Sequence, residues 1–219
     1  MPEAVLFDLD GTLADTAPDL GGALNQLLLE QGRAPLSMEQ LRPHVSSGAR
    51  GMIGAGLGMT PGDPAYLALQ QRFLAIYQEA LCVGTRLFEG MAEHLDELEK
   101  QGIPWGIVTN KSQRFAIPLM EGLGLRQRSL CIVCGDSAQR SKPHAHPMQL
   151  ASAVIGIAAT DCIYVGDDER DVISGRAVGM RTVIAAWGYL GDGKPPAAWG
   201  ADAIAASPHD ILGIAAANR

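Results

Sequence analysis

Short apolar runs alternate with amphipathic segments through most of the chain. Four helical patterns, at residues 91–101, 113–123, 147–154 and 172–178, lie between runs rich in branched side chains. Those runs are typical of strands buried on both faces, and they cover residues 4–7, 105–109, 130–134, 162–165 and 182–185. This order predicts right-handed strand–helix–strand units. The expected fold class is therefore α/β, a Rossmann-like parallel sheet with helices on both faces.

Residues 18–81 break this alternation, because they show helical periodicity without a convincing strand. The helical patterns cover residues 20–31, 38–44, 48–56 and 65–80. We therefore expect a Rossmann-like catalytic core of residues 1–15 and 85–219, and a small helical-bundle cap of residues 16–84 inserted after the first strand. The natural hinges are residues 15–17 and 82–88.

The glycine-rich segment 48–58 is a poor helix on intrinsic propensity alone. Either this segment frays, or its glycines permit close approach to a neighbour or a ligand.

Composition and charge exclude several functions. The 219 residues are 47% hydrophobic and 19% charged, with a formal net charge of −7. Nucleic-acid backbones bind clustered Lys and Arg, which this chain lacks, so we expect no nucleic-acid partner. No apolar run approaches the roughly 18 residues that span a bilayer, so we expect no membrane partner. The N-terminus shows no secretory signal, and this with only four cysteines predicts a cytoplasmic protein with reduced thiols.

Two pairs of side chains could ligate a metal, but neither pattern favours it. Cys131 and Cys134 form a C-x-x-C inside an apolar run, which favours a buried strand over a redox or metal site. His144 and His146 form an H-x-H that could bind a transition metal. No third ligand is evident near it, so an exposed loop is the favoured interpretation. The remaining histidines show no partners in the pattern: His44, His94 and His209.

The first predicted strand leads into two aspartates. Asp8 and Asp10 are two residues apart, so in extended geometry their side chains point the same way. Two carboxylates this close repel one another unless a cation lies between them or one is protonated. In-line phosphoryl transfer needs such a pair, because one carboxylate attacks phosphorus while the other protonates the leaving oxygen and then activates water. A simple turn at Asp10-Gly11 is the alternative, but it leaves unexplained why a buried strand leads to two acids.

Polar side chains also follow the later strands. Thr109 and Asn110 close the second core strand and could hydrogen-bond phosphate oxygens, and Lys142 could serve as a fixed cation for the transferred phosphoryl group. The fourth strand ends in an acidic run beginning at Asp167, which is costly without a divalent cation. Hard oxygen ligands with few histidines favour Mg²⁺ over zinc. Each of these polar segments has a simpler explanation: Thr109 and Asn110 as a helix cap, Lys142 as a surface charge, and the acidic run as a solvated helix start. However, all of these segments follow strands, so we expect them together at the carboxyl edge of the sheet, where ligands bind.

These motifs resemble those of the haloacid-dehalogenase-like hydrolases over nearly the whole chain. The matching residues are Asp8-Leu9-Asp10-Gly11-Thr12, Thr109, Lys142 and Gly166-Asp167-Asp168 with Asp171. The resemblance implies a helical cap on a Rossmann-like core, an aspartyl-phosphate on Asp8, and Asp10 as general acid and base. It also implies that the Asp8 carboxylate, the Asp10 main-chain carbonyl and Asp167 hold Mg²⁺, supported by Asp171. Members that cleave carbon–halogen bonds lack an acid at the position of Asp10, which argues against dehalogenation.

Further segments resemble a narrower family, the N-acetylmuramic acid 6-phosphate phosphatases of peptidoglycan recycling, which are similar to phosphoglycolate phosphatases. These segments are residues 47–50, 87–91, 105–111 and 199–202. The resemblance implies a sugar phosphate substrate with a lactyl carboxylate, and makes Arg50 in the cap a candidate partner for a substrate anion. A surface arginine on a mobile helix explains Arg50 equally well.

We therefore expect a magnesium-dependent phosphomonoester hydrolase that acts on a small phosphorylated metabolite, a sugar phosphate or phosphoglycolate. The expected catalytic residues are Asp8, Asp10, Thr109 and Lys142, and the expected substrate-binding residues are Thr109, Asn110, Lys142 and Arg50. A phosphosugar mutase shares these residues and stays an alternative. A phospho-receiver-like binding protein also clusters aspartates and a lysine, but it has no insertion after its first strand. The pattern leaves the oligomeric state and the resting position of the cap open.

Overall fold

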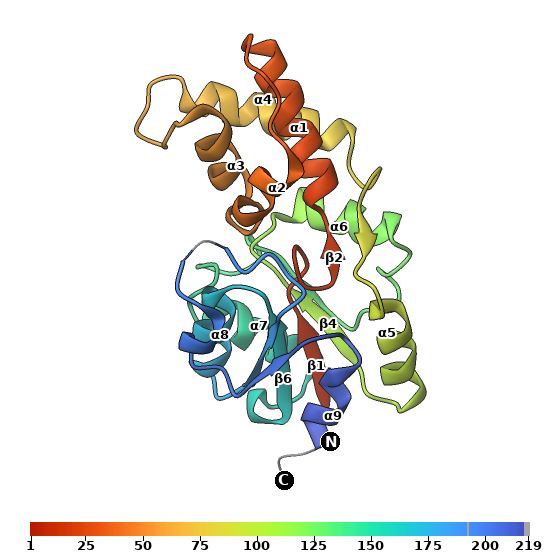
Figure 1. Cartoon of the computed structure of the whole chain (residues 1–219). Helices are drawn as coiled ribbons and strands as arrows, with labels where there is room; N and C mark the ends of the chain where they lie inside the picture. Colours follow the sequence, from red (N-terminus) through yellow and green to blue (C-terminus); the bar gives the residue numbers. More distant parts are fainter. Residues whose placement is uncertain (192, 217–219) are drawn as a thin grey trace.

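The computed structural model describes residues 1–191 and 193–216, and it places a helical bundle above a parallel sheet (Figure 1). The sheet has the strand order β5-β4-β1-β6-β7-β8, and every pairing in it is parallel. The strands are β1 (Ala4–Phe7), β4 (Trp105–Val108), β5 (Ile132–Val133), β6 (Cys162–Gly166), β7 (Arg181–Ala185) and β8 (Ala203–Ala205). Strand β1 lies between β4 and β6, so Asp8 leaves the sheet at its centre. The predicted α/β fold class is confirmed.

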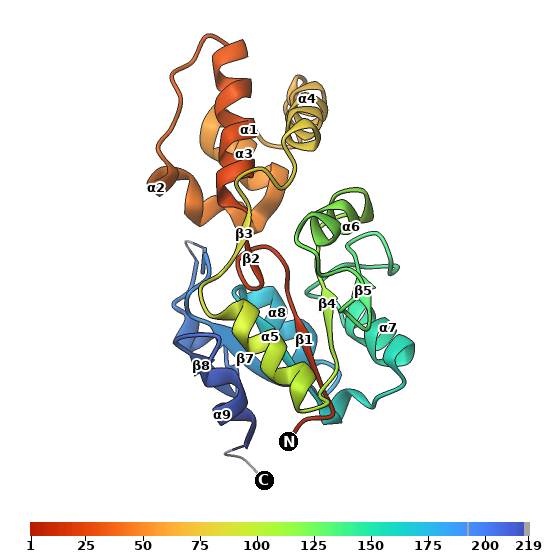
Figure 2. The same cartoon turned by 90° about the vertical axis from the view of Figure 1, so that its right-hand side faces the viewer.

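Helices cover both faces of the sheet. Successive strand residues point to opposite sides, and in β1 both sets of side chains are apolar, so each face needs a covering layer. Val5 and Phe7 join one apolar cluster with helices α5 (Met91–Lys100), α6 (Gln113–Gly122) and α9 (Asp210–Ala216). Ala4 and Leu6 join the cluster on the other face, where α7 (His146–Ile155) and α8 (Glu169–Arg176) pack against the strands (Figure 2). Every residue of β1 is fully buried, which explains its continuous apolar run.

Several elements differ from the sequence prediction. Strand β8 and helix α9 were not predicted, since Ala203–Ala205 offers only one branched side chain and lies at the sheet edge. Helix α8 begins at Glu169 rather than at residue 172. Its acidic start is a capping box, in which the Asp168 side chain accepts a hydrogen bond from Arg170 N (2.9 Å) and the Asp171 side chain accepts one from Asp168 N (3.1 Å).

The inserted helices pack around a shared apolar cluster. Helices α1 (Ala17–Glu30), α2 (Met38–Leu41), α3 (Gly48–Leu57) and α4 (Tyr66–Glu79), with the 3-10 helix η1 (Arg42–Ser47), pack around leucines of α1 and Phe73. Phe115 and Tyr189 of the core belong to the same cluster, so the proposed cap of residues 16–84 has an apolar interior that continues into the core. The proposed core also includes residues 192 and 217–219, which lie outside the described residues.

The glycine-rich segment forms helix α3 rather than fraying. A Cβ at Gly56 would lie 2.9 Å from a methyl carbon of Leu24 on α1, and a Cβ at Gly51 would overlap the His44 carbonyl. The glycines therefore allow α3 to pack closely against its neighbours, which offsets their low helix propensity.

Two short strands connect the cap to the core. Strand β2 (Ala14–Asp15) pairs antiparallel with β3 (Arg86–Leu87), so the two chain crossings run side by side. The buried carboxylate of Asp19, in the first turn of α1, accepts hydrogen bonds from Gly84 N (2.6 Å), Thr85 N (3.0 Å) and Thr85 Oγ1 (2.7 Å). The expected hinge segments are therefore tied to each other by hydrogen bonds.

The cysteines are free thiols, and most of them are buried. Cys131 and Cys134 belong to the apolar interior, and burial raises the pKa of each thiol to about 11. A raised pKa keeps a thiol protonated and unreactive, so the C-x-x-C is a structural feature as expected.

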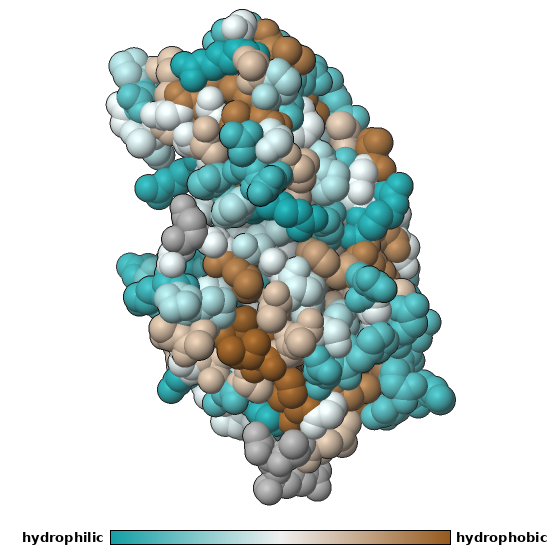
Figure 3. All heavy atoms as spheres, viewed as in Figure 1, coloured by the Kyte–Doolittle hydropathy of each residue, from teal (hydrophilic) through white to brown (hydrophobic). Residues whose placement is uncertain are grey.

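The surface differs between cap and core. In Figure 3 the cap shows hydrophilic and apolar atoms side by side, and apolar atoms form a band on the core below it. Ile204 of the edge strand β8 is 48% exposed.

Within the part of the chain that the structure describes, no helix combines the length and the apolar character needed to cross a membrane.

Candidate active site

A cavity of about 520 Å³ lies between the cap and the carboxyl ends of the strands. The cap supplies a largely apolar wall, and the core supplies polar and charged side chains. The core residues that line the cavity are Asp8, Asp10, Thr109, Asn110, Lys111, Ser112, Arg114, Phe115, Lys142, Asp168, Arg170 and Asp171. The segments that follow β1, β4, β5 and β6 carry these residues, and they include the first turns of α6 and α8. The parallel sheet thus brings distant segments of sequence to one place.

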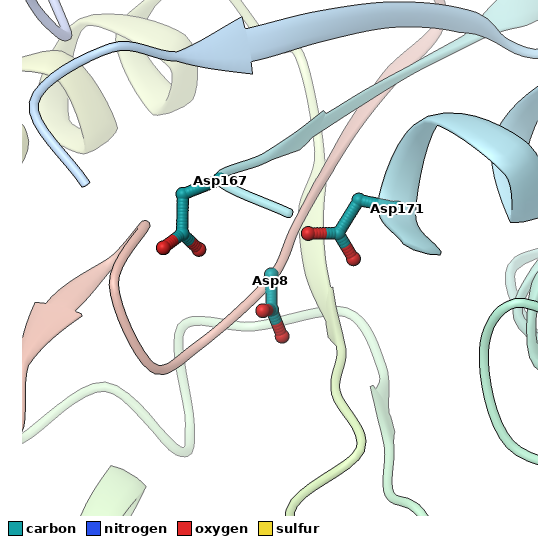
Figure 4. A group of neighbouring side chains, drawn as sticks. All are labelled: Asp8, Asp167 and Asp171. Carbon is teal, nitrogen blue, oxygen red and sulfur yellow. The ribbon is translucent and has the colours of Figure 1, made fainter. Parts of the chain in front are cut away.

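Three aspartates gather at the base of this cavity. Asp8 follows β1, Asp167 follows β6, and Asp171 lies in the first turn of α8; oxygen atoms of the three lie within 4.8 Å of one another. Figure 4 shows the three side chains approaching one another from separate segments. Burial, together with Asp8 and Asp171, raises the pKa of Asp167 well above its ordinary value. Burial also raises the pKa of Asp171 to about 6, although Lys142 acts in the opposite direction. A buried carboxylate with a raised pKa keeps its negative charge only when a cation lies close to it.

The donor atoms in this cluster fit a divalent cation. Lys142 Nζ lies 2.9 Å from Asp8 Oδ1 and 2.7 Å from Asp171 Oδ1, so one ammonium group forms ion pairs with two of the carboxylates. The three carboxylates therefore share Lys142, and the negative charge that it leaves uncompensated is costly unless a further cation contacts them. The acidic cluster can therefore hold a divalent metal ion.

Lys142 is held rigidly beside the aspartates. Its ammonium group donates to Val108 O (2.9 Å) and to the Tyr164 hydroxyl (2.8 Å), and lies 2.7 Å from Asp171 Oδ1. Burial acts against the charge of this ammonium group, but Asp171 and Asp8 outweigh it and raise the pKa of Lys142. A fixed, permanently charged lysine therefore faces the Asp8 carboxylate.

Asn110 and Thr109 hold different positions at the end of β4. The Asn110 side chain donates to Lys142 O (3.0 Å) and accepts from Lys142 N (2.9 Å), so its amide is engaged with the backbone that carries the lysine. The buried Thr109 hydroxyl lines the cavity and accepts a hydrogen bond from Lys111 N (3.1 Å). Its own proton therefore stays available for a phosphate oxygen.

Asp10 is set apart from the three aspartates. Its Oδ1 accepts hydrogen bonds from Thr16 Oγ1 (2.6 Å) and from Lys111 Nζ (2.9 Å). The Lys111 ammonium also lies 4.8 Å from the centre of the Tyr77 ring, which belongs to the cap. Lys111 was not among the residues expected at the site. Its only signal was its place directly after Thr109 and Asn110 at a strand end.

Arg50 lies exposed on α3 and is not among the residues that line the cavity. Two other arginines line it instead, Arg114 of α6 and Arg170 of α8. Arg170 pairs with Asp168 (2.7 Å) and also donates to Ser46 O (2.8 Å), so it joins the core to the cap. Helical periodicity could not have distinguished these positions, because it does not tell which helix face meets another domain.

Tyr189 is a further residue of the site region that the sequence pattern does not single out. Its hydroxyl accepts hydrogen bonds from Thr16 N (2.8 Å) and Ala17 N (2.9 Å) at the start of the cap, and its backbone N–H donates to Asp167 Oδ2 (2.9 Å). One residue therefore connects the stem of the cap to the acidic cluster.

The H-x-H pair stands apart from the acidic cluster. The rings of His144 and His146 are 6.5 Å apart, centre to centre. Within residues 1–191 and 193–216, neither belongs to a group of three side chains that could hold a metal ion.

Comparisons with known proteins agree with this geometry. The family model of the haloacid dehalogenase-like hydrolases matches residues 5–185. An N-acetylmuramic acid 6-phosphate phosphatase of Pseudomonas aeruginosa is 42% identical over 212 residues, which cover 97% of this chain and 94% of the relative. A phosphoglycolate phosphatase of Xanthomonas campestris pv. campestris is 44% identical over 211 residues, which cover 96% of this chain and 95% of the relative.

A solved structure supports the same assignment. The crystal structure of a predicted phosphoglycolate phosphatase from Haemophilus somnus matches with a TM-score of 0.86 at 25% identity, and the match covers 97% of each chain. The resemblance expected from the four motifs is thus confirmed. The chain belongs to the haloacid dehalogenase-like hydrolase family.

Proposed function

We propose that this chain is a magnesium-dependent phosphomonoester hydrolase that forms an aspartyl-phosphate on Asp8. One observation carries the proposal: the carboxylates of Asp8, Asp167 and Asp171 converge within 4.8 Å, and Lys142 forms ion pairs there with Asp8 and Asp171. The Asp8 carboxylate also lines the cavity, where one of its oxygens can contact a metal ion while the other attacks phosphorus.

The Asp8 and Asp167 carboxylates and the Asp10 main-chain carbonyl would hold Mg²⁺, and Asp171 would support the site through water or through Lys142. Oxygen donors of this kind suit Mg²⁺. When bound, the ion would offset the repulsion between the Asp8 carboxylate and a dianionic phosphate. For unit charges about 4 Å apart at an effective dielectric of about 20, that repulsion is roughly 4 kcal/mol.

The chain's own residues can carry both chemical steps. The Asp8 carboxylate attacks phosphorus, the ester P–O bond breaks, and Asp10 gives a proton to the leaving oxygen. Asp10 then takes a proton from the water that attacks the aspartyl-phosphate, which releases phosphate and restores Asp8. Lys111 and Thr16 hold the Asp10 carboxylate through 2.9 Å and 2.6 Å hydrogen bonds, while Lys142 and Thr109 stabilise the transferred group.

We propose N-acetylmuramic acid 6-phosphate as the substrate. The volume of about 520 Å³ falls within the range of roughly 300–1,000 Å³ that is typical of small-molecule sites, and the two-carbon phosphoglycolate would fill little of it. Leu20, Phe73 and Leu74 of the cap line the cavity and suit the apolar faces of a sugar and its acetyl group. Phosphoglycolate is the second candidate, because the Xanthomonas campestris relative at 44% identity bears that name.

The proposed setting is the cytoplasm, and the proposed ligand is a small phosphorylated metabolite rather than nucleic acid or a membrane. The net charge of −7 disfavours binding to nucleic acid or to an anionic membrane surface.

Phosphate release from the two candidate substrates tests the proposal. With Mg²⁺ present we expect a higher kcat/KM for N-acetylmuramic acid 6-phosphate than for 2-phosphoglycolate, and EDTA should abolish release from both. Preference for phosphoglycolate would keep the mechanism and replace the substrate. Formation of an isomer from a hexose 1-phosphate, without phosphate release, would identify a mutase instead.

A further inference from the structure

We propose that Arg114 binds a carboxylate on the leaving part of the substrate. This inference rests on the proposed phosphatase function and deepens it, because it names a second anionic group that the substrate must carry. The position differs from Arg50, which the sequence had suggested for a substrate anion.

Arg114 differs from the other cations that line the cavity, because each of those lies beside a carboxylate. Lys142 lies beside Asp171 and Asp8, Lys111 lies 2.9 Å from Asp10, and Arg170 lies 2.7 Å from Asp168. Arg114 is the remaining cation in the lining, and no carboxylate of residues 1–191 and 193–216 forms an ion pair with it. Three of the cations are therefore neutralised within the protein, whereas the charge of Arg114 is available to a ligand.

The Arg114 guanidinium group is oriented by a neighbouring aromatic ring. Its central carbon lies 4.3 Å from the centre of the Phe115 ring, so the ring holds one face of the group. Phe115 is itself fixed, because it is buried and its ring packs against Tyr77 of the cap at 5.4 Å. A guanidinium that contacts an aromatic ring through its face keeps the N–H groups of its edge free. That edge matches the two oxygens of a carboxylate.

The position of Arg114 relative to the reacting groups suits the far end of a bound substrate. Thr109 ends β4 at the base of the cavity, and Arg114 lies in the first turn of α6, beside the contact between Phe115 and the cap. A ligand with its phosphate at Asp8 would therefore reach Arg114 with a group at its other end. The proposed substrate and its alternative are both phosphomonoesters that also carry a carboxylate. In the sugar phosphate, the carboxylate lies farther from the phosphate than it does in phosphoglycolate.

Two substrate pairs test the proposal, each differing by the acidic group. N-acetylmuramic acid 6-phosphate is compared with N-acetylglucosamine 6-phosphate, which lacks the lactyl group, and 2-phosphoglycolate is compared with ethyl phosphate. In Arg114→Gln we expect kcat/KM for the preferred acid to fall roughly 10- to 100-fold, the scale of a charge-assisted hydrogen-bonded pair. The value for the partner compound that lacks the carboxylate should change less than about twofold. Arg114→Lys should retain part of the preference, and the matched control Arg50→Gln should retain all of it.

Each other outcome counts against the proposal. An equal loss on both members of a pair, or no loss on either, would overturn it, as would a wild-type enzyme that favours the acid in neither pair. Wild-type enzyme that releases phosphate from none of the four compounds with Mg²⁺ would overturn the proposed function, and this inference with it. Thermal unfolding of each variant checks that the exposed position tolerates the change.

Discussion

Two carboxylates that are neighbours in sequence have separate partners in the structure. Asp8 faces Lys142, whereas Asp10 faces Lys111 and Thr16. The separation gives each carboxylate its own environment, which is what distinct roles as nucleophile and as general acid require. Lys142 belongs to the core alone, while Lys111 also contacts Tyr77 of the cap.

Replacement of the proposed nucleophile tests the first of these roles. Asp8→Asn keeps the shape of the side chain but removes the attacking charge, so we expect kcat to fall by about 10³-fold or more. Phosphate release measures the loss, and unfolding in urea should show that the variant is folded. Asp96→Asn on the exposed surface of α5 is a matched control that should keep full activity. Substantial turnover by Asp8→Asn would exclude Asp8 as the nucleophile.

Lys111 offers a separate test of how Asp10 is positioned. Lys111→Met keeps the length of the side chain and removes its hydrogen bonds to Asp10, so the general acid loses one of two partners. We expect kcat to fall about tenfold, with a smaller change in KM, since the loss affects the proton-transfer step. Lys100→Met, on the exposed end of α5, should change neither parameter. A rise in KM alone would instead indicate that Lys111 serves in substrate binding.

At the scale of elements, the two chain crossings between cap and core depend on one buried carboxylate. Asp19 accepts three hydrogen bonds from Gly84 and Thr85, and it does so next to the β2–β3 pairing. A helix of the cap is thereby tied to the segment by which the chain returns to the core.

Removal of that carboxylate should destabilise the connection. In Asp19→Ala the backbone N–H groups of Gly84 and Thr85 lose their acceptor, so we expect the free energy of unfolding to fall by about 2–4 kcal/mol. Thr85→Val removes only the hydroxyl bond and should cost about 1 kcal/mol. Urea unfolding measures both variants. If Asp19→Ala is as stable as Thr85→Val, the backbone bonds to Asp19 contribute little.

Among the strands of the sheet, the sequence predicted those that are largely buried. The fully buried strand β1 shows as an apolar run, whereas the edge strand β8 has one branched residue, Ile204, that is about half exposed. The predicted site residues at strand ends do meet at one edge of the sheet, because the fold class alone determines that edge. Arg114 and Tyr189 could not be selected, since their roles depend on how the cap packs on the core.

At the scale of the whole molecule, buried titratable groups act in opposite directions as the pH falls. The pKa of Asp171 is raised to about 6, so protonation below that pH favours the folded state in the absence of metal. His94 acts the other way. It is buried on α5 against the edge of the Phe7 ring, and its Nε2 has no hydrogen bond. Burial, with a smaller effect of His209, lowers the pKa of His94 to about 4.

The sign for His94 follows from the two pKa values. Above pH 6.5 the imidazole is neutral in both states and contributes nothing. As the pH falls from 6.5 toward 4, the unfolded chain binds a proton that the folded chain does not, so the free energy of unfolding falls by up to about 3 kcal/mol. His94→Leu fills the same apolar site without a titratable group and should lose this dependence.

Urea unfolding of both proteins at pH 7.5 and at pH 4.5 isolates the effect. The aspartates are common to wild type and variant, so their opposing contribution cancels in the difference between the two proteins. We expect His94→Leu to gain about 2–3 kcal/mol over wild type at pH 4.5 relative to pH 7.5. An unchanged difference would mean that His94 accepts its proton inside the folded protein, which would require the packing of α5 against β1 to open in acid.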